Sequence, residues 1–345
     1  MPRTDYIQRE KTILEAIIKA YIRTGRPVSS RAVAGMDEVG QSPATVRNVM
    51  SVLTDKGMLD QPHVSAGRIP TLAGMRYYLR SFLTLERLDS HCRESIINSL
   101  MDSGPDFNAT LRQASRVLSS FSNQVAMIMS PAQAAATWKQ IDFVLLKPGL
   151  VMSVLVLEGG LISNRMIETE KKLSGDELIY YSNYLNEHFQ GKTVSEIRKS
   201  IVRQLRDAPK NFENLYLQAL YLARNACEDA LDRELFVDGA TKVLNNNRVD
   251  ISQLKDLLDL LEEKSKLLTL LDGTIKASDI RVFFAEDHGL TNLSNYGFIS
   301  SPYGPENNAL GSVGVIGPVH MNYPRLIPTV DLVAQILTQL FQKNS

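Results

Sequence analysis

The residues in this sequence best suited to recognition chemistry lie in one segment, Ser42-Pro-Ala-Thr-Val-Arg-Asn48. Ser42 is a favourable N-cap, and Pro43 occupies the first helical position, where its missing N–H costs nothing. Apolar residues at helical spacing predict a buried face made of Val46, Val49, Met50 and Leu53. The opposite face then presents small and hydrogen-bonding side chains to solvent, those of Ala44, Thr45, Arg47, Asn48 and Ser51.

These exposed side chains have the chemistry that reads base edges in duplex DNA. Arginine matches the two acceptors of guanine in the major groove, and asparagine matches adenine. We therefore expect Thr45, Arg47 and Asn48 to contact bases at the N-terminal end of a recognition helix, with Ala44 beside them.

Other residues have the chemistry of phosphate contacts. Ser29 or Ser30 caps a short predicted helix, and with Ser42 these hydroxyls and their helix N-termini would hold phosphates. Arg31 would contact the same backbone. Arg68 is expected at the tip of a wing, where it would meet the backbone or enter a minor groove.

The elements around these residues follow the order of a winged helix-turn-helix. A long helix carrying Ile13 to Ile22 ends at Gly25, a second runs to about Val39, and Gly40-Gln41 turns into the Ser42 helix. Residues 59–62 and 69–71 are expected to form the wing strands, and a further helix covers about 72–85. Winged helices also bind proteins, so that alternative stays open.

The charge distribution favours a nucleic-acid partner for the N-terminal part only. The whole chain has 38 basic and 38 acidic residues, a net charge of zero. Residues 1–87 hold 13 Lys and Arg against 8 Asp and Glu, a balance of +5, so the remainder, with 25 against 30, has −5. The polar N-terminus and the absence of a long apolar run favour the cytoplasm, and two distant cysteines suggest no disulfide framework.

Two clusters resemble enzymatic motifs, and both are better explained structurally. The glycines between Gly311 and Gly317 have neither dinucleotide-loop nor P-loop spacing, so we expect a strand passing close to its neighbours. Glu286-Asp287-His288 has no second cluster to complete a site, so a solvated turn is expected. We predict no enzyme activity, catalytic residue, cofactor or metal.

The remainder of the chain predicts an α+β domain interrupted by a mainly helical insertion. Strand patterns before and after a helical block suggest this division. The expected units are a DNA-binding domain at 1–85, a linker at 86–106, one discontinuous domain at 107–170 and 245–345, and an insert at 171–244. Apolar helical stripes, one through Cys227 and one at residues 254–271, are ordinary core or a homodimer surface.

Several motifs together resemble the heat-inducible transcription repressor HrcA family, nearly end to end. They are Thr24-Gly-Arg-Pro-Val-Ser-Ser-Arg31, the Ser42–Asn48 segment, Gln61-Pro-His-Val-Ser-Ala-Gly-Arg-Ile-Pro-Thr71 and, late in the chain, Leu310-Gly-Ser-Val-Gly-Val-Ile-Gly-Pro318 with Met321, Tyr323 and Arg325.

The resemblance implies a winged-helix domain, a GAF-like α+β domain and an inserted dimerising domain. It implies repression of chaperone operons at an inverted-repeat operator called CIRCE, with the chaperonin keeping the repressor active. The alternative is a ligand-responsive winged-helix regulator that senses a small molecule through the GAF-like domain.

Overall fold

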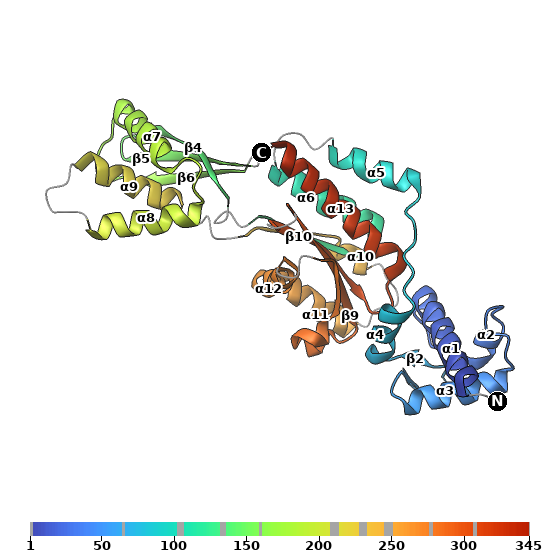
Figure 1. Cartoon of the computed structure of the whole chain (residues 1–345). Helices are drawn as coiled ribbons and strands as arrows, with labels where there is room; N and C mark the ends of the chain where they lie inside the picture. Colours follow the sequence, from blue (N-terminus) through green and yellow to red (C-terminus); the bar gives the residue numbers. More distant parts are fainter. Residues whose placement is uncertain are drawn as a thin grey trace.

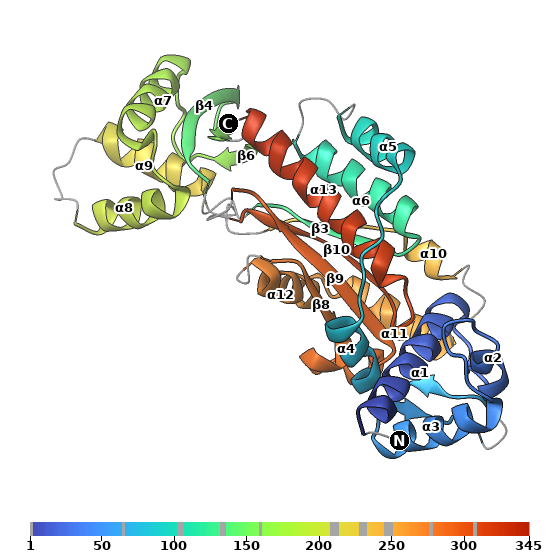
Figure 2. The same cartoon turned by 45° about the vertical axis from the view of Figure 1, so that its right-hand side comes forward.

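The computed structural model describes residues 3–63, 66–101, 107–131, 136–158, 161–207, 214–227, 233–244, 251–275, 279–305 and 309–344. These residues form three units that lie in a row (Figures 1 and 2). The blue N-terminal unit is at one end, a sheet covered by helices is in the middle, and the green and yellow unit is at the other end.

The N-terminal unit is the winged helix-turn-helix that the sequence predicts. Three helices precede a two-stranded antiparallel wing, and a fourth helix follows it. Their bounds are α1 (Arg3–Thr24), α2 (Ser30–Ala34), α3 (Pro43–Asp55), β1 (Leu59–Asp60), β2 (Ile69–Pro70) and α4 (Leu72–Ser81). The apolar face of α1 packs on α3, so Ile13, Leu14, Ile17 and Ile18 are buried as expected.

A five-stranded antiparallel sheet forms the middle unit, in the order β7-β3-β10-β9-β8. The strands are β3 (Val125–Met129), β7 (Leu235–Asp238), β8 (Arg281–Phe284), β9 (Tyr296–Tyr303) and β10 (Gly311–Pro318). All five residues of β3 are buried. Because successive side chains of a strand point to opposite faces, this burial requires helices on both sides of the sheet.

Helices cover both faces of this sheet (Figure 2). Ala126 and Ile128 share a core with buried residues of α6 (Phe107–Ser122) and α13 (Tyr323–Asn344). Met127 and Met129 face the other way, toward α11 (Ile251–Glu262) and α12 (Lys264–Ile275). Two shorter helices complete the unit, α5 (Ser90–Met101) and α10 (Ala240–Leu244).

The expected linker at 86–106 contains a packed helix. Ile96 and Leu100 of α5 are buried, and the helix contacts α6 and α13. Because most residues of this segment are polar, its two buried apolar positions were not recognised in the sequence. These two side chains lie on one side of the helix and attach it to the middle unit.

The third unit is a separate three-stranded sheet with helices on one face. Its strands are β4 (Trp138–Lys147), β5 (Leu150–Leu157) and β6 (Ile162–Glu168), paired in that order. Its helices are α7 (Gly175–Phe189), α8 (Val194–Asp207) and α9 (Asn214–Ala226). Because α7 contacts β4 and α9 contacts β5 and β6, the two helices cover this sheet.

This pairing differs from the expected division of the chain. The strands between 138 and 168 were expected in the main domain (107–170), yet among the described residues they pair only with one another. Conversely, β7 falls inside the expected insert (171–244) but joins β3 of the main sheet. Alternation of apolar and polar residues identifies a strand but does not indicate which sheet it joins.

The helical stripes proposed as a possible dimer surface are largely core within the single chain, as far as the structure describes them. Leu220, Ala223 and Cys227 have no exposed surface, and Leu257, Leu267 and Leu271 are also buried. Burial raises the pKa of the Cys227 thiol to about 12, so this side chain behaves as a small apolar residue.

We predict that Asn186→Ala destabilises the third unit. The Asn186 side chain accepts hydrogen bonds from Trp138 Nε1 (3.1 Å) and Ile141 N (2.7 Å), and it donates one to Ile141 O (3.0 Å). Removing it leaves these groups unpaired, at a cost of about 1–3 kcal/mol. Urea denaturation monitored by Trp138 fluorescence measures the change. Asn183→Ala on the exposed side of α7 is the control, and an equal effect of both substitutions would contradict the prediction.

Candidate nucleic-acid interface

The N-terminus of α3 is built as the sequence predicts. The Ser42 hydroxyl accepts a hydrogen bond from Thr45 N at 3.2 Å and lies 3.0 Å from Thr45 Oγ1. The expected apolar face is buried, with Val46, Val49, Met50 and Leu53 each at most 4% exposed. Ala44, Arg47 and Asn48 are consequently exposed and Thr45 is half-buried.

The residues before and within α2 form a second polar edge. Ser29 is the N-cap of α2, and its hydroxyl accepts from Ala32 N at 3.2 Å. Buried Val33 anchors this five-residue helix in the same core as α3. Ser29 and Arg31 are exposed, and Ser30 is half-buried.

A backbone pair joins the wing to the start of α2. Val28 N donates to Arg68 O and Arg68 N donates to Val28 O, both at 2.8 Å. Arg68 therefore lies at the base of the wing, next to β2, and the expected position at the wing tip is wrong. Gly67 makes this close approach possible, because a Cβ there would lie 2.4 Å from the carbonyl of Val28.

These contacts create a hollow of about 430 Å³ between α2, α3 and the wing. It brings together four of the residues predicted to contact DNA, Ser29, Ser30, Arg47 and Arg68. The other predicted residues, Arg31, Ser42, Ala44, Thr45 and Asn48, lie outside its lining. Arg68 Nε is buried and has no hydrogen-bond partner among the described residues.

Sequence reasoning missed Gln61, Ala66 and Gly67 as lining residues of this hollow. Gln61 Nε2 donates to Ala66 O at 3.2 Å and closes the wing across its base. The position of Gly67 opposite Val28 depends on a long-range pairing that has no local sequence pattern.

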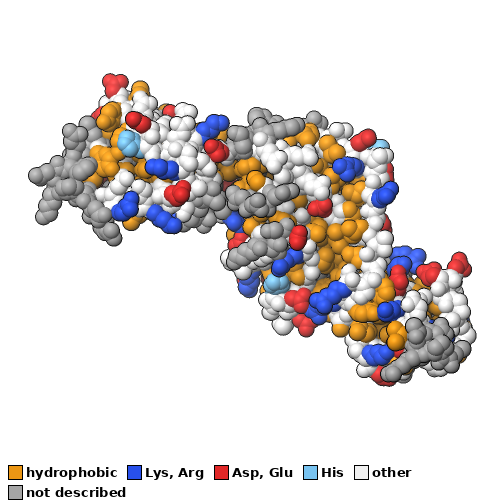
Figure 3. All heavy atoms as spheres, in the orientation of Figure 1, with side chains coloured by type: hydrophobic (Ala, Val, Ile, Leu, Met, Phe, Trp, Pro, Cys, Tyr) orange, Lys and Arg blue, Asp and Glu red, His pale blue; other side chains and the backbone are white. Residues whose placement is uncertain are grey.

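Polar and aromatic groups are among the contacts between the DNA-binding unit and the middle unit, and hydrophobic and charged side chains both lie where the two units adjoin (Figure 3). Arg76 on α4 forms an ion pair with Asp287 and lies over the Phe284 ring, 5.4 Å from its centroid. The rings of Tyr21 and His320 meet edge-on with centroids 5.5 Å apart. The Arg76 and Asp287 side chains are both 37% exposed, so water screens their ion pair.

The two enzyme-like clusters are structural. Glu286-Asp287-His288 forms a short 3-10 helix that ends at Gly289, and Asp287 contacts Arg76 in addition to being partly solvated as expected. The Gly311–Gly317 segment is buried in β10, as predicted, and a Cβ on Gly311 would lie 2.3 Å from Met129 O. Among the described residues no three His, Cys, Asp or Glu side chains are placed to hold a metal ion, and none of the described helices is long and apolar enough to cross a membrane.

The fold and this polar surface define a winged-helix DNA-binding protein. A family model described as the winged helix-turn-helix transcription repressor, HrcA DNA-binding, matches residues 5–79, and one described as the HrcA protein C-terminal domain matches residues 108–327. The chain belongs to the HrcA family, as its motifs indicated, and a family of transcription repressors agrees with the expectation that it is not an enzyme.

Curated relatives and a solved structure span nearly the whole chain. The heat-inducible transcription repressor HrcA of Nitratidesulfovibrio vulgaris (strain DSM 19637 / Miyazaki F) is 40% identical over 98% of this chain and 96% of its own length. That of Geobacter sulfurreducens is 37% identical over 98% of this chain and 99% of its own length. A crystal structure of a hypothetical protein is 22% identical, covers 98% of this chain and 99% of that one, and shares the fold with a TM-score of 0.65.

We predict that Gly67→Ala opens the hollow. Its Cβ has no space against the Val28 backbone, so the pair between Val28 and Arg68 must separate. The expected cost is about 1–3 kcal/mol in the stability of the DNA-binding unit, together with weaker binding to duplex DNA. Chemical denaturation and fluorescence anisotropy with a labelled duplex measure both. Gly35→Ala is the control, since its Cβ would meet nothing closer than 3.6 Å; wild-type behaviour of both variants would show that the pair is dispensable.

Proposed function

We propose that this chain represses transcription by inserting α3 into the major groove of an inverted-repeat operator. The observation that carries the proposal is the exposed, singly basic edge of α3, where Arg47 and Asn48 are held next to the hollow formed with the wing. Thr45, Arg47 and Asn48 contact bases, and Ser29, Ser30, Arg31, Ser42 and Arg68 contact the sugar–phosphate backbone.

The buried Nε of Arg68 supports a phosphate contact at the hollow. A buried donor without a partner is costly, and a phosphate oxygen supplies an acceptor of opposite charge. Because the hydroxyls of Ser29 and Ser30 line the same hollow, several donors converge on one anionic group.

The protein binds this operator as a homodimer, through the outer face of the β4-β5-β6 sheet. This face is opposite to α7 and α9, and it presents Val144, Ile162 and Met166 with 44%, 59% and 73% of their surface exposed. In the sheet register Val144 pairs with Met152, which pairs with Met166, so apolar side chains run across all three strands. A contiguous exposed apolar face of this kind is typical of a protein interface, and an isologous pair matches the symmetry of an inverted repeat.

The regulated operons and the partner follow from family membership. The two relatives described above are called heat-inducible repressors, and for this chain we propose the CIRCE operator of chaperone operons and a chaperonin that maintains the active repressor. An electrophoretic mobility shift with a CIRCE duplex, with and without chaperonin, tests both points. Equal binding to a scrambled duplex would reject the operator, and an active fraction that does not change with chaperonin would reject the partner.

We predict that Arg47→Ala weakens operator binding by about 1–3 kcal/mol and relaxes the preference at a single base pair. The loss of specificity is expected because the guanidinium contacts a base edge. Anisotropy titrations against a panel of operators, each with one substituted base pair, measure the effect. An equal loss on every sequence would identify Arg47 as a phosphate contact.

Arg68→Ala is expected to act differently. Loss of one phosphate contact weakens binding to all sequences alike and reduces the slope of log affinity against log salt by about one. Titrations between low and moderate salt measure this slope. A slope equal to that of the unsubstituted protein would show that Arg68 does not contact the DNA backbone.

We predict that Ile162→Glu combined with Met166→Glu converts the dimer to a monomer. Two carboxylates on each copy would have to be desolvated next to their counterparts at the interface. Sedimentation velocity measures the oligomeric state. Ile179→Glu on α7 is the matched control, since Ile179 is 60% exposed and Ile162 is 59% exposed; a dimer that survives the double substitution and dissociates with the control would place the interface on the helices.

A further inference from the structure

The hollow between α2, α3 and the wing is cationic and has no carboxylate in its lining. Its charged lining residues are Arg47 and Arg68, and neither forms an ion pair with a described residue. Asp60 precedes the lining residue Gln61, but Asp60 is exposed and its carboxylate accepts a hydrogen bond from Gln61 N at 2.7 Å. The lining therefore carries two positive charges that no side chain of the hollow neutralises.

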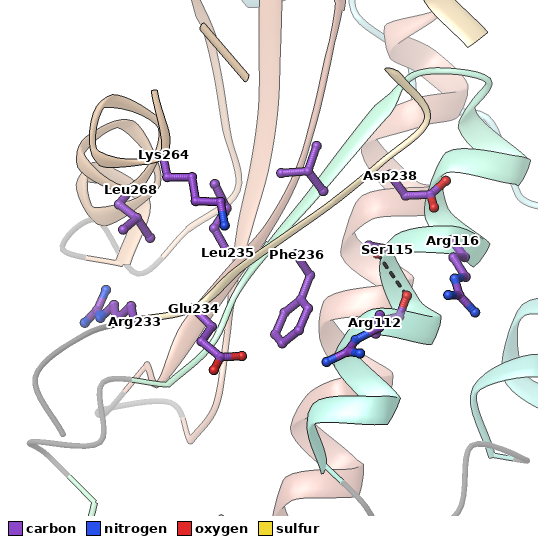
Figure 4. A pocket seen from close by; sticks show the side chains of 11 residues that line it. Arg112, Ser115, Arg116, Arg233, Glu234, Leu235, Phe236, Asp238, Lys264 and Leu268 are labelled. Atoms are coloured by element: carbon purple, nitrogen blue, oxygen red, sulfur yellow. Dashed lines mark hydrogen bonds between the residues drawn. The ribbon is translucent and has the colours of Figure 1, made fainter. Parts of the chain in front are cut away.

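The larger pocket beside β7, of about 590 Å³, differs in this respect (Figure 4). Two of its cations, Arg112 and Arg116, lie on one side of the strand. The carboxylates of Glu234 and Asp238 lie on that same side (Figure 4). Because these charges balance one another, this pocket does not favour an anion, and the hollow in the DNA-binding unit is the better site for one.

The fold holds the donors of the hollow in place. The backbone of Arg68 is fixed by two hydrogen bonds of 2.8 Å to Val28, and its buried Nε has no hydrogen-bond partner among the described residues. The hydroxyls of Ser29 and Ser30 line the same hollow. Guanidinium groups bind phosphate oxygens through strong, charge-assisted hydrogen bonds, so a phosphate group suits this set of donors.

The two positive charges match a terminal phosphate better than a phosphate within a DNA strand. Each phosphate of a DNA strand carries one negative charge. A phosphate monoester carries about 1.5 to 2 negative charges at pH 7, because its second pKa is about 6. A backbone phosphate would therefore leave about one charge of the hollow unbalanced, whereas a monoester would balance nearly both.

The size of the hollow and its remaining walls leave room for an organic group beside the phosphate. Its volume of about 430 Å³ lies within the range of about 300–1,000 Å³ that is typical of small-molecule sites. Met50 and Ala66 add apolar surface to the lining, and Gln61 adds an amide. A sugar presents both C–H groups and hydroxyls, so it matches walls of this mixed character.

We propose that the hollow is a site for a free sugar phosphate, a monoester that competes with the operator for the same arginines. Arg47 and Arg68 hold its phosphate, and the sugar lies against the apolar part of the lining. The competition rests on the proposed function, because the free phosphate occupies the place proposed for a phosphate of the operator backbone. Repression is then released as the concentration of such compounds rises.

Ribose 5-phosphate, titrated by calorimetry into the full chain without DNA, tests the site itself. We expect saturable binding, weakened about tenfold by Arg68→Ala and about tenfold by Arg47→Ala, since each removes a charge-assisted hydrogen bond. Arg47 is exposed on α3, so Arg47→Ala gives a valid result even if Arg68→Ala disturbs the wing. Arg26→Ala is the matched control, because Arg26 is exposed two residues before Val28 and lies outside the lining. Equal weakening by Arg26→Ala would reveal general charge attraction and overturn the site.

Three further compounds test the chemistry of the ligand. Dimethyl phosphate, a diester with one negative charge, is expected to bind at least tenfold more weakly than ribose 5-phosphate, and ribose is expected not to bind. Equal binding of dimethyl phosphate would show that the second negative charge contributes nothing. Equal binding of inorganic phosphate would show the same of the sugar. Either result would overturn the assignment to a sugar phosphate.

Anisotropy titrations with a labelled CIRCE duplex at constant ionic strength measure the competition. Ribose 5-phosphate at ten times its Kd is expected to raise the apparent Kd of the duplex about elevenfold, and ribose at the same concentration is expected to have no effect. A sugar phosphate that binds the free chain and leaves duplex affinity unchanged would overturn the competition. Absence of duplex binding without any competitor would instead contradict the proposed function, and the calorimetric result would still decide whether the hollow binds a sugar phosphate.

Discussion

The geometry of the DNA-binding surface depends on one backbone pair, between Val28 and Arg68. Two hydrogen bonds hold the base of the wing against the residue that precedes the Ser29 cap. The pair fixes the separation of the Ser29 and Ser30 hydroxyls from the Arg68 guanidinium, and the packing of α2 on α3 places Arg47 beside them. The strands β1 and β2, of two residues each, pack on α1, α3 and α4. The pair between Val28 and Arg68 adds the contact that holds the wing to the start of α2.

The contact between the DNA-binding unit and the middle unit is weaker than the contacts within either unit. Its ion pair is partly exposed, and its ring contact joins Tyr21 and His320, which are both half-buried. Exposed ion pairs contribute at most about 1 kcal/mol. The residues proposed to meet an operator are therefore positioned mainly by contacts within their own unit. This arrangement is compatible with the proposed dimer, whose two recognition helices would have to match the spacing of two half-sites.

The sequence was sufficient to predict α3, because its signals are local. The Ser42 cap, Pro43 and the spacing of Val46, Val49, Met50 and Leu53 all lie within one helix and agree with one another. The position of Arg68 could not be predicted in this way, since it depends on a partner forty residues earlier. The strands β4, β5 and β6 lie in the range expected to belong to the main domain, and that assignment was wrong because the choice of sheet is decided by tertiary packing. The strand β7 was missed because its four residues are too few to show a period.

The way the chain enters and leaves the third unit explains how a unit of this size is inserted into a sheet. The chain leaves the sheet at the end of β3 and returns at the start of β7, and Met129 and Leu235 are partners in the register. Ser130 and Glu234 extend that pairing by one step, since Ser130 N donates to Glu234 O and Glu234 N donates to the Ser130 hydroxyl, both at 2.8 Å. The insertion thus begins and ends at one point, so it interrupts no hydrogen bond of the main sheet. The same return of the chain makes β7 the outermost of the described strands of this sheet, so the position of this sheet edge is a direct consequence of the insertion.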